Sequence, residues 1–209
     1  MALLLIIVPG FAWERVVSAR RGVLSITLFF LLPLIAATSV GEGYGLVRFG
    51  KEQPTYKFTN QYTKLTPAQA TAFELIQAAG SLAIIFACAY VVKSLCETFH
   101  VRHTYLQGFT SVAYGLSPMF LFRLLDMVPA LYPWIPWVIG IALSVGALYI
   151  GIPRIMNPDP SHAFGLYVMS SVVLVAATGL LQIVTAGYLM GKIKALNGVV
   201  DGLAQFIPI

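Results

Sequence analysis

The chain is dominated by long apolar runs in which polar and apolar positions do not alternate. Each run has a charge-free centre long enough to cross a bilayer, which takes about 20 residues of helix. The lack of alternation argues against membrane strands, and hydrocarbon forces each run to satisfy its own backbone hydrogen bonds as a helix. The predicted transmembrane helices cover about residues 23–40, 70–93, 104–124, 132–152 and 162–188. The pattern therefore predicts an all-α polytopic membrane protein, a bundle of about five transmembrane helices.

Two segments outside these runs are amphipathic. Around Trp13, apolar side chains share a short segment with charged ones, and residues 192–206 repeat apolar side chains at helical spacing with polar ones opposite. Such helices lie flat in the headgroup region of a membrane. Residues 1–10 lack the basic start and the cleavage site of a signal peptide. We expect a single transmembrane domain over residues 1–209, with interfacial amphipathic segments at both ends.

Composition supports a lipid environment. The 209 residues are 58% hydrophobic and only 10% charged, where a soluble protein carries roughly 25% charged residues. Such a chain has too little polar surface to cover itself in water. The net charge of +5 comes from 13 Lys and Arg residues spread over the loops, where they can meet anionic lipid headgroups. The expected partner is therefore the lipid bilayer, and nucleic acid is not expected.

The basic residues orient the chain only weakly. The predicted segments on the N-terminal side of the membrane and those on the opposite side carry nearly equal numbers of Lys and Arg, so the positive-inside rule shows no overall bias. Arg20 and Arg21, however, lie directly before the first predicted helix, whereas Arg48 lies well beyond its end. This difference favours a cytoplasmic N-terminus and a C-terminus on the other side.

No catalytic motif occurs in the sequence. Walker loops, nucleotide-binding glycine fingerprints, Gly-x-Ser-x-Gly and HExxH are all missing. Cys88 and Cys96 lie on or at the end of one predicted helix, without a CxxC motif, and are interpreted as small packing residues. No predicted span carries paired carboxylates. We therefore predict that the protein is not an enzyme and uses no cofactor.

Arg123 and Asp126 form the first candidate binding site. Their i,i+3 spacing places them on one face of the third predicted helix. One interpretation is a polar contact point for an ion, a lipid headgroup or a partner. The other is an interfacial ion pair in which Arg123 extends to the membrane surface.

Tyr114 and Pro118 are further candidate binding residues within the same predicted helix. A proline inside a span frees a backbone carbonyl, and a broken helix can mark a transport path or serve only as a kink that improves packing. Pro33 in the first predicted helix is open to the same two interpretations. Gln77 is expected to form a hydrogen bond between helices.

Three histidines are weak candidates for a metal site. His100 and His103 follow the second predicted helix, and His162 begins the fifth, on the same side of the membrane. Imidazole nitrogens suit zinc. Because the spacing of these residues is common and their loops need not meet, no metal is predicted, and solvated loop residues are the default interpretation.

Several proline, glycine and tyrosine motifs resemble those of the Yip1 domain family. Residues 105–109 and 112–118 look like the family's entry into its third helix, and residues 149–158 look like the end of its fourth. Trp13 and the Leu32–Pro33 pair fit a proline-containing first helix that follows an interfacial tryptophan. The resemblance covers most of the chain and is to the short prokaryotic members.

The resemblance implies a multi-pass protein of the cell inner (cytoplasmic) membrane. Eukaryotic members take part in vesicle trafficking and bind small GTPases, often through an N-terminal cytosolic segment. Only a short segment precedes the first predicted helix here, so that activity is not expected. The preferred hypothesis is a non-enzymatic Yip1-like membrane protein that acts through contacts with lipid, other membrane proteins or itself. The alternative is a small transporter or channel for an ion or a small polar solute.

Overall fold

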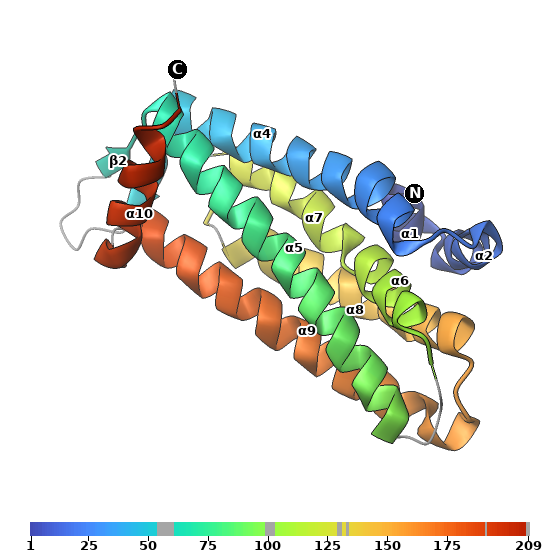
Figure 1. Cartoon of the computed structure of the whole chain (residues 1–209). Helices are drawn as coiled ribbons and strands as arrows, with labels where there is room; N and C mark the ends of the chain where they lie inside the picture. The colour runs from blue at the N-terminus through green and yellow to red at the C-terminus, as the bar shows by residue number, and fades with distance from the viewer. Residues whose placement is uncertain (54–60, 99–102, 129–130, 133, 191, 208–209) are drawn as a thin grey trace.

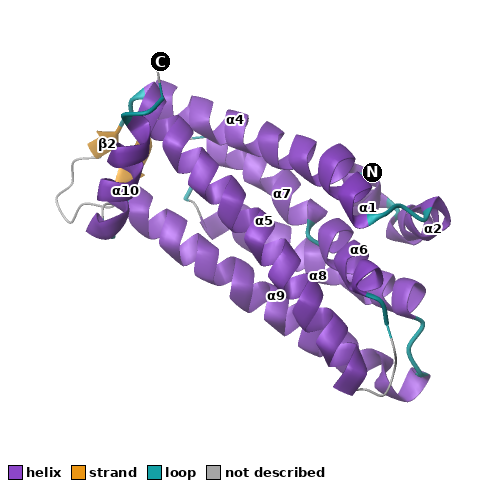
Figure 2. Ribbon diagram, viewed as in Figure 1, coloured by secondary structure: helices purple, strands orange, loops and turns teal. Residues whose placement is uncertain are grey.

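Four long helices carry most of the apolar sequence in the computed structural model (Figures 1 and 2). The structure describes residues 1–53, 61–98, 103–128, 131–132, 134–190 and 192–207. Within them, the four helices that are long and apolar enough to cross a membrane are Val23–Arg48, α5 (Pro67–Thr98), α8 (Trp134–Met156) and α9 (Pro160–Leu189). The prediction of an all-α polytopic protein is confirmed, and of the about five predicted transmembrane helices four are continuous within the described residues.

The predicted third span, residues 104–124, is the one that is not continuous. It divides into α6 (Tyr105–Gly115), α7 (Ser117–Arg123) and a short 3-10 turn, η2 (Leu124–Met127). Pro118 explains the break, because proline donates no amide hydrogen and its ring collides with the preceding turn of a helix.

The broken segment still runs from one end of the bundle to the other. At one end, the Gln107 side chain donates a hydrogen bond to the carbonyl of Ile155, near the C-terminal end of α8. At the other end, the backbone of Met127 packs against Gly45. A Cβ at position 45 would collide with it. In Figure 1, α6 lies beside α5 and α7 continues toward the far end. In the described part of the chain, four continuous long helices and this broken segment therefore run along the bundle.

The first long helix contains a wider turn just before its proline. It consists of α3 (Val23–Ile26), a π-helical turn η1 (Thr27–Leu31) and α4 (Leu32–Arg48). A π-helical turn accommodates the Pro33 ring, which would otherwise meet the carbonyl of the preceding turn. Pro33 therefore bends this helix without interrupting it.

The two ends of the chain lie at opposite ends of the bundle (Figure 1). At the N-terminus, α1 (Ala2–Ile7) and α2 (Pro9–Ala19) follow one another. At the other end, α10 (Lys194–Ala204) packs against α5, next to a short ribbon of β1 (Lys51–Gln53) and β2 (Gln61–Thr63). This ribbon was not predicted from the sequence.

Trp13 packs into the bundle, a contact that the amphipathic pattern alone did not predict. Its indole is fully buried, its Nε1 donates to the carbonyl of Ala147 at 2.8 Å, and its ring covers Gly151. The contact could not be predicted because the helix that receives the ring, α8, lies far away in the sequence. α10 follows its prediction more closely, with Val200 buried and Val199 exposed.

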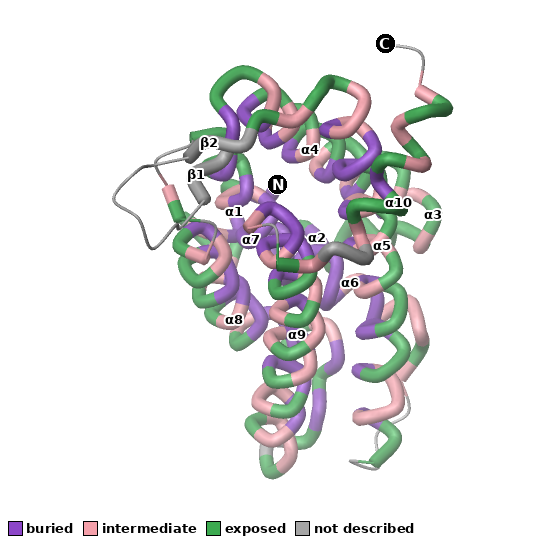
Figure 3. The backbone as a smooth tube through the Cα atoms, turned by 90° about the vertical axis from the view of Figure 1, so that its left-hand side faces the viewer, coloured by how far each residue is buried: buried purple, intermediate pink, exposed green. Residues whose placement is uncertain are grey.

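Burial follows one face of each long helix. In Figure 3 the buried residues line the inside of the bundle and the exposed ones face outward. Many exposed side chains on the long helices are large and apolar, such as Phe29, Val138, Val172 and Leu180. In water this surface would be costly, whereas in hydrocarbon it is solvated. The few charged side chains inside the bundle consequently define the candidate site.

Candidate functional site

A buried ion pair joins α4 to α7. Arg123 Nη2 lies 2.8 Å from Glu42 Oε2, and each side chain is only 5% exposed. Helix α4 contributes Glu42 about two turns before its end, and α7 contributes Arg123 as its last residue. A charged group is costly in hydrocarbon unless it is paired. The pair thus satisfies two charges that neither helix could carry alone.

Two further polar residues surround the pair. Gln77, on α5, donates a hydrogen bond from Nε2 to Glu42 Oε2 at 3.2 Å, which confirms its predicted role between helices. Asp126, on η2, is buried close by on the same segment as Arg123. We call Glu42, Glu74, Gln77, Arg123 and Asp126 the polar cluster. It brings side chains from α4, α5, α7 and η2 to one end of the bundle.

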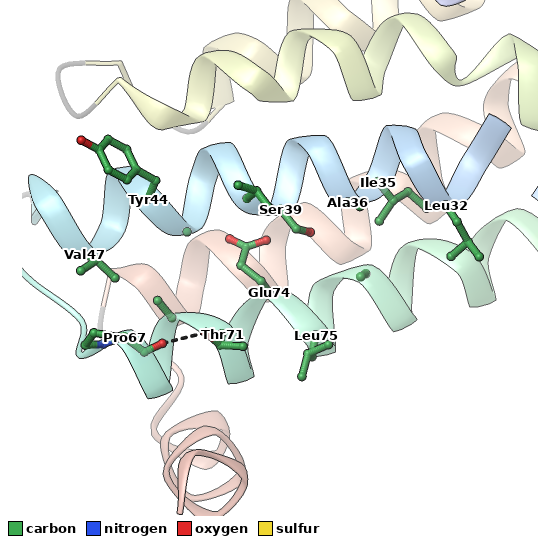
Figure 4. A pocket seen from close by; sticks show the side chains of 14 residues that line it. Leu32, Ile35, Ala36, Ser39, Tyr44, Val47, Pro67, Thr71, Glu74 and Leu75 are labelled. Atoms are coloured by element: carbon green, nitrogen blue, oxygen red, sulfur yellow. Dashed lines mark hydrogen bonds between the residues drawn. The ribbon is translucent and has the colours of Figure 1, made fainter. Parts of the chain in front are cut away.

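Glu74 is a second buried glutamate of the polar cluster, outside the Glu42–Arg123 ion pair. It is 6% exposed. Its carboxylate points from α5 toward Ser39 on α4 (Figure 4), whose hydroxyl can donate to only one of the two oxygens. Glu74 is therefore a buried acceptor with spare capacity.

The Glu74 carboxylate faces an apolar cavity between α4 and α5. The cavity has a volume of about 540 Å³. Its polar lining groups are few, and the rest of its wall is aliphatic, with Leu32 and Ile35 toward one end and Val47 and Pro67 toward the other (Figure 4). Val40 and Leu75, which also line it, are exposed on the outer surface of the two helices. The cavity thus opens sideways from the bundle.

The position of Glu74 along α5 places it near a membrane boundary. The 32 residues of α5 extend over about 48 Å, whereas the hydrocarbon layer is about 30 Å thick. Glu74 lies about two turns into the helix, close to the level at which hydrocarbon gives way to headgroups. The cavity continues past Glu74 toward Leu32 and the bilayer centre. The cavity thus has a polar side chain near the membrane boundary and an apolar space toward the bilayer centre. A lipid has its polar and apolar parts in the same order.

The candidate pair Arg123 and Asp126 lies inside this cluster, not at the membrane surface. Both residues are buried, so the interpretation in which Arg123 extends to the headgroups is wrong. The guanidinium is held by Glu42, which the sequence analysis did not consider as a partner. Glu42 and Glu74 are both buried in this cluster, one on α4 and one on α5, an arrangement that the search for paired carboxylates within one span did not consider.

Tyr114 and Pro118 lie in the packed core, away from the polar cluster. Tyr114 is buried against Phe30, with 4.3 Å between ring centroids, and its edge meets Trp13. After the helix break, the Met119 amide donates to Ser144 Oγ at 3.1 Å and Ser117 Oγ donates to the carbonyl of Tyr114. Side chains therefore satisfy the backbone at the break, which favours the packing interpretation over a transport path.

The histidine candidates do not converge within the described residues. His100 lies outside them. His103 precedes α6 and His162 lies in the first turn of α9, and each is partly buried. Within the described part of the chain, no group of three His, Cys, Asp or Glu side chains is placed to hold a metal ion.

Glu42 and Glu74 are the functional candidates that sequence reasoning missed. Each flanks a charge-free run, and the predicted membrane boundaries were drawn at or near them. One signal was available: Glu42 stands between Gly41 and Gly43, within a run that is otherwise free of charge until Arg48. A lone carboxylate beside small residues indicates a helix that continues and packs closely.

These features define a polytopic helical membrane protein with a buried polar cluster and a lateral apolar cavity. A model of the Yip1 domain matches residues 3–182, so the chain belongs to the Yip1 domain family, as its motifs predicted. The match contains the whole polar cluster and ends within α9. No curated protein and no solved structure matches the chain significantly.

Proposed function

We propose that this Yip1-family protein is a non-enzymatic membrane protein that acts by binding lipid between α4 and α5. The observation that carries the proposal is the sideways opening of the apolar cavity, whose aliphatic wall suits an acyl chain. Contacts with other membrane proteins or with a second copy would then involve the same outer surface. We further propose the cell inner membrane as its location, with the N-terminus in the cytoplasm.

Physical reasoning supports lipid as the occupant. The cavity is bounded by spanning helices, so the molecules that meet its opening are those of the bilayer. Burying a chain against Ile35 and Ala78 removes no polar group from water, and it gains dispersion contacts that a loosely filled groove lacks. The volume of about 540 Å³ suits part of one acyl chain together with its head.

The test fills the cavity with a side chain. Ala36 lines the cavity, whereas the neighbouring Ala37 is exposed outside it, so Ala36→Trp and Ala37→Trp form a matched pair. Wild-type and variant proteins are reconstituted in nanodiscs that contain a lipid with a photoactivatable acyl chain, and crosslinks are mapped by mass spectrometry. We expect Ala36→Trp to remove crosslinks to the cavity walls and Ala37→Trp to retain them. Equal crosslinking in the two variants would contradict the proposal.

Transport of an ion or a small polar solute is the second candidate function. One observation favours it: the charged cluster of Glu42, Arg123 and Asp126 inside the bundle. Buried charges occur along transport paths.

Flux measurements in liposomes distinguish the two functions. Purified protein is reconstituted, and the uptake of protons, alkali cations and small polar solutes is measured. The lipid-binding proposal predicts no flux above that of empty liposomes. Flux that Asp126→Ala abolishes, and that Ala36→Trp leaves unchanged, would establish transport in its place.

A further inference from the structure

The chemistry of the cavity indicates which lipid head it accepts. Glu74 is the charged side chain among the lining residues, and its carboxylate points into the space between α4 and α5 (Figure 4). Both of its oxygens are buried, and the Ser39 hydroxyl, which faces them from α4, can supply only one donor for the two. A buried acceptor left unsatisfied is costly, so a ligand that supplies donors is favoured there.

The nearest cation does not fill this role. Arg123 directs Nη2 at Glu42, and the Gln77 side chain also donates to Glu42. Arg123 Nη2 and Gln77 Nε2 are thus both directed at Glu42, while the Glu74 carboxylate faces the cavity. Glu74 is the acidic side chain among the residues that line the cavity. A cationic head that carries donors can pair with its carboxylate, whereas an anionic head cannot.

We propose, building on the lipid-binding function above, that the cavity selects a membrane lipid whose head carries a primary ammonium, which donates hydrogen bonds to the Glu74 carboxylate. An ammonium brings three donors and a positive charge, which satisfies both oxygens and offsets the charge. A hydroxyl head brings one donor and no charge. A trimethylated ammonium brings the charge without any donor. The acyl chain then extends from Glu74 toward Leu32, along the aliphatic wall.

The depth of Glu74 is consistent with this arrangement. The carboxylate lies near the boundary of the hydrocarbon layer, so the head of a bound lipid needs no displacement into the bilayer centre to reach it. The deeper part of the cavity, around Ile35 and Ala78, meets only the chain. A lipid bound at this site would therefore keep its head near the membrane boundary and its chain toward the bilayer centre, as in the bilayer.

The experiment compares two lipids that differ only in the head. Photoactivatable phosphatidylethanolamine and phosphatidylcholine with identical chains are both zwitterionic, but only the first can donate hydrogen bonds. Each is placed at the same fraction in nanodiscs with the wild-type protein, and crosslinks to the cavity walls are quantified. Charge-assisted hydrogen bonds are among the strong ones, so we expect the ethanolamine lipid to be favoured by about tenfold.

Two substitutions assign the preference to Glu74. Glu74→Gln keeps the shape of the side chain and removes its charge, and Glu74→Leu also removes the acceptor. In both variants, the ratio of crosslinking by the ethanolamine lipid to crosslinking by the choline lipid should fall toward one. Asp201→Asn is the matched control, because Asp201 is an exposed carboxylate at the same end of the bundle. It should leave the ratio unchanged.

The outcomes separate this inference from the function on which it rests. Equal labelling by the two lipids in the wild-type protein would overturn the ammonium preference without any need for a variant. A preference that survives in both Glu74 variants would overturn the role of the carboxylate. If labelling of the cavity by either lipid persists in Ala36→Trp, the lipid-binding function itself fails.

Discussion

The Glu42 carboxylate and the Arg123 guanidinium meet at 2.8 Å inside the bundle, each nearly excluded from the surface. They join the first long helix to the end of the broken one. The contact explains how a chain with so few charges places some of them within spanning segments. Glu42 thus has a cation as its partner, whereas Glu74, another buried carboxylate of the polar cluster, faces the cavity.

Removing one member of this pair should destabilise the protein strongly. Arg123→Met or Glu42→Leu leaves the other charge buried without its partner, at a cost of about 3–5 kcal/mol. The double variant replaces both by apolar groups of similar size and should be close to wild type in stability. The free energy of unfolding is measured by steric trapping in bicelles. Single variants as stable as the double variant would contradict the importance of the pair.

Adding a methyl group at Gly151 should displace Trp13. The Cβ of Gly151→Ala would overlap the indole ring, whereas Gly146, on the same helix, has no neighbouring atom within 4 Å of the corresponding position. We expect Gly151→Ala to cost about 1–3 kcal/mol through overpacking. Gly146→Ala should be neutral or slightly stabilising, because alanine favours helix. Thermal unfolding in detergent micelles compares the two, and equal midpoints would show that Trp13 is not packed there.

The attachment of α10 depends on one buried side chain. Val200 is 0% exposed and packs with Phe73 and Tyr188, whereas its neighbour Val199 is 54% exposed. Val200→Asp buries an unpaired charge, so α10 should detach, and its amides should exchange with deuterium faster than in wild type. Val199→Asp should leave exchange over residues 194–204 unchanged. A similar response to both substitutions would mean that α10 is not docked through this face.

The break between α6 and α7 depends on the Ser144 hydroxyl, which accepts the Met119 amide hydrogen. Ser144→Ala leaves this buried amide without an acceptor and should cost about 1–3 kcal/mol. Ser18→Ala, at an exposed position, should change stability by less than about 0.5 kcal/mol. Unfolding free energies of the two variants are compared under identical conditions. If Ser144→Ala has no larger effect than Ser18→Ala, the Met119 amide at the break does not depend on Ser144 for its hydrogen bond.

The membrane class and the family could be predicted from sequence because both depend on patterns that are local in the chain. Apolar runs, the position of Pro118 and the motifs around Tyr149 need no knowledge of neighbours. The continuity of the third span could not be read in this way. Pro118 predicts a break or a kink equally well, and only the contact with Ser144 on α8 shows which one occurs.

The candidate site was harder to predict because it depends on contacts between distant segments. Arg123 was identified, but its partner Glu42 precedes it by two predicted spans, and Gln77 and Glu74 lie between them. The packing of Trp13 was missed for the same reason, since Ala147 and Gly151 are its neighbours only after folding. The length of a charge-free run also underestimates the length of a helix. Val23–Arg48 extends beyond Glu42, and Pro67–Thr98 begins before Glu74.

The central claim is that the outer faces of these helices lie in hydrocarbon while the charged residues face inward. A nitroxide label at Val172, which is 56% exposed near the middle of α9, tests it most directly, with Cys88 and Cys96 first replaced by alanine. In reconstituted bilayers we predict that this label collides freely with oxygen and is shielded from a water-soluble nickel chelate, whereas a label at Arg48 shows the reverse. A label at Val172 as accessible to nickel as the one at Arg48 would contradict the account.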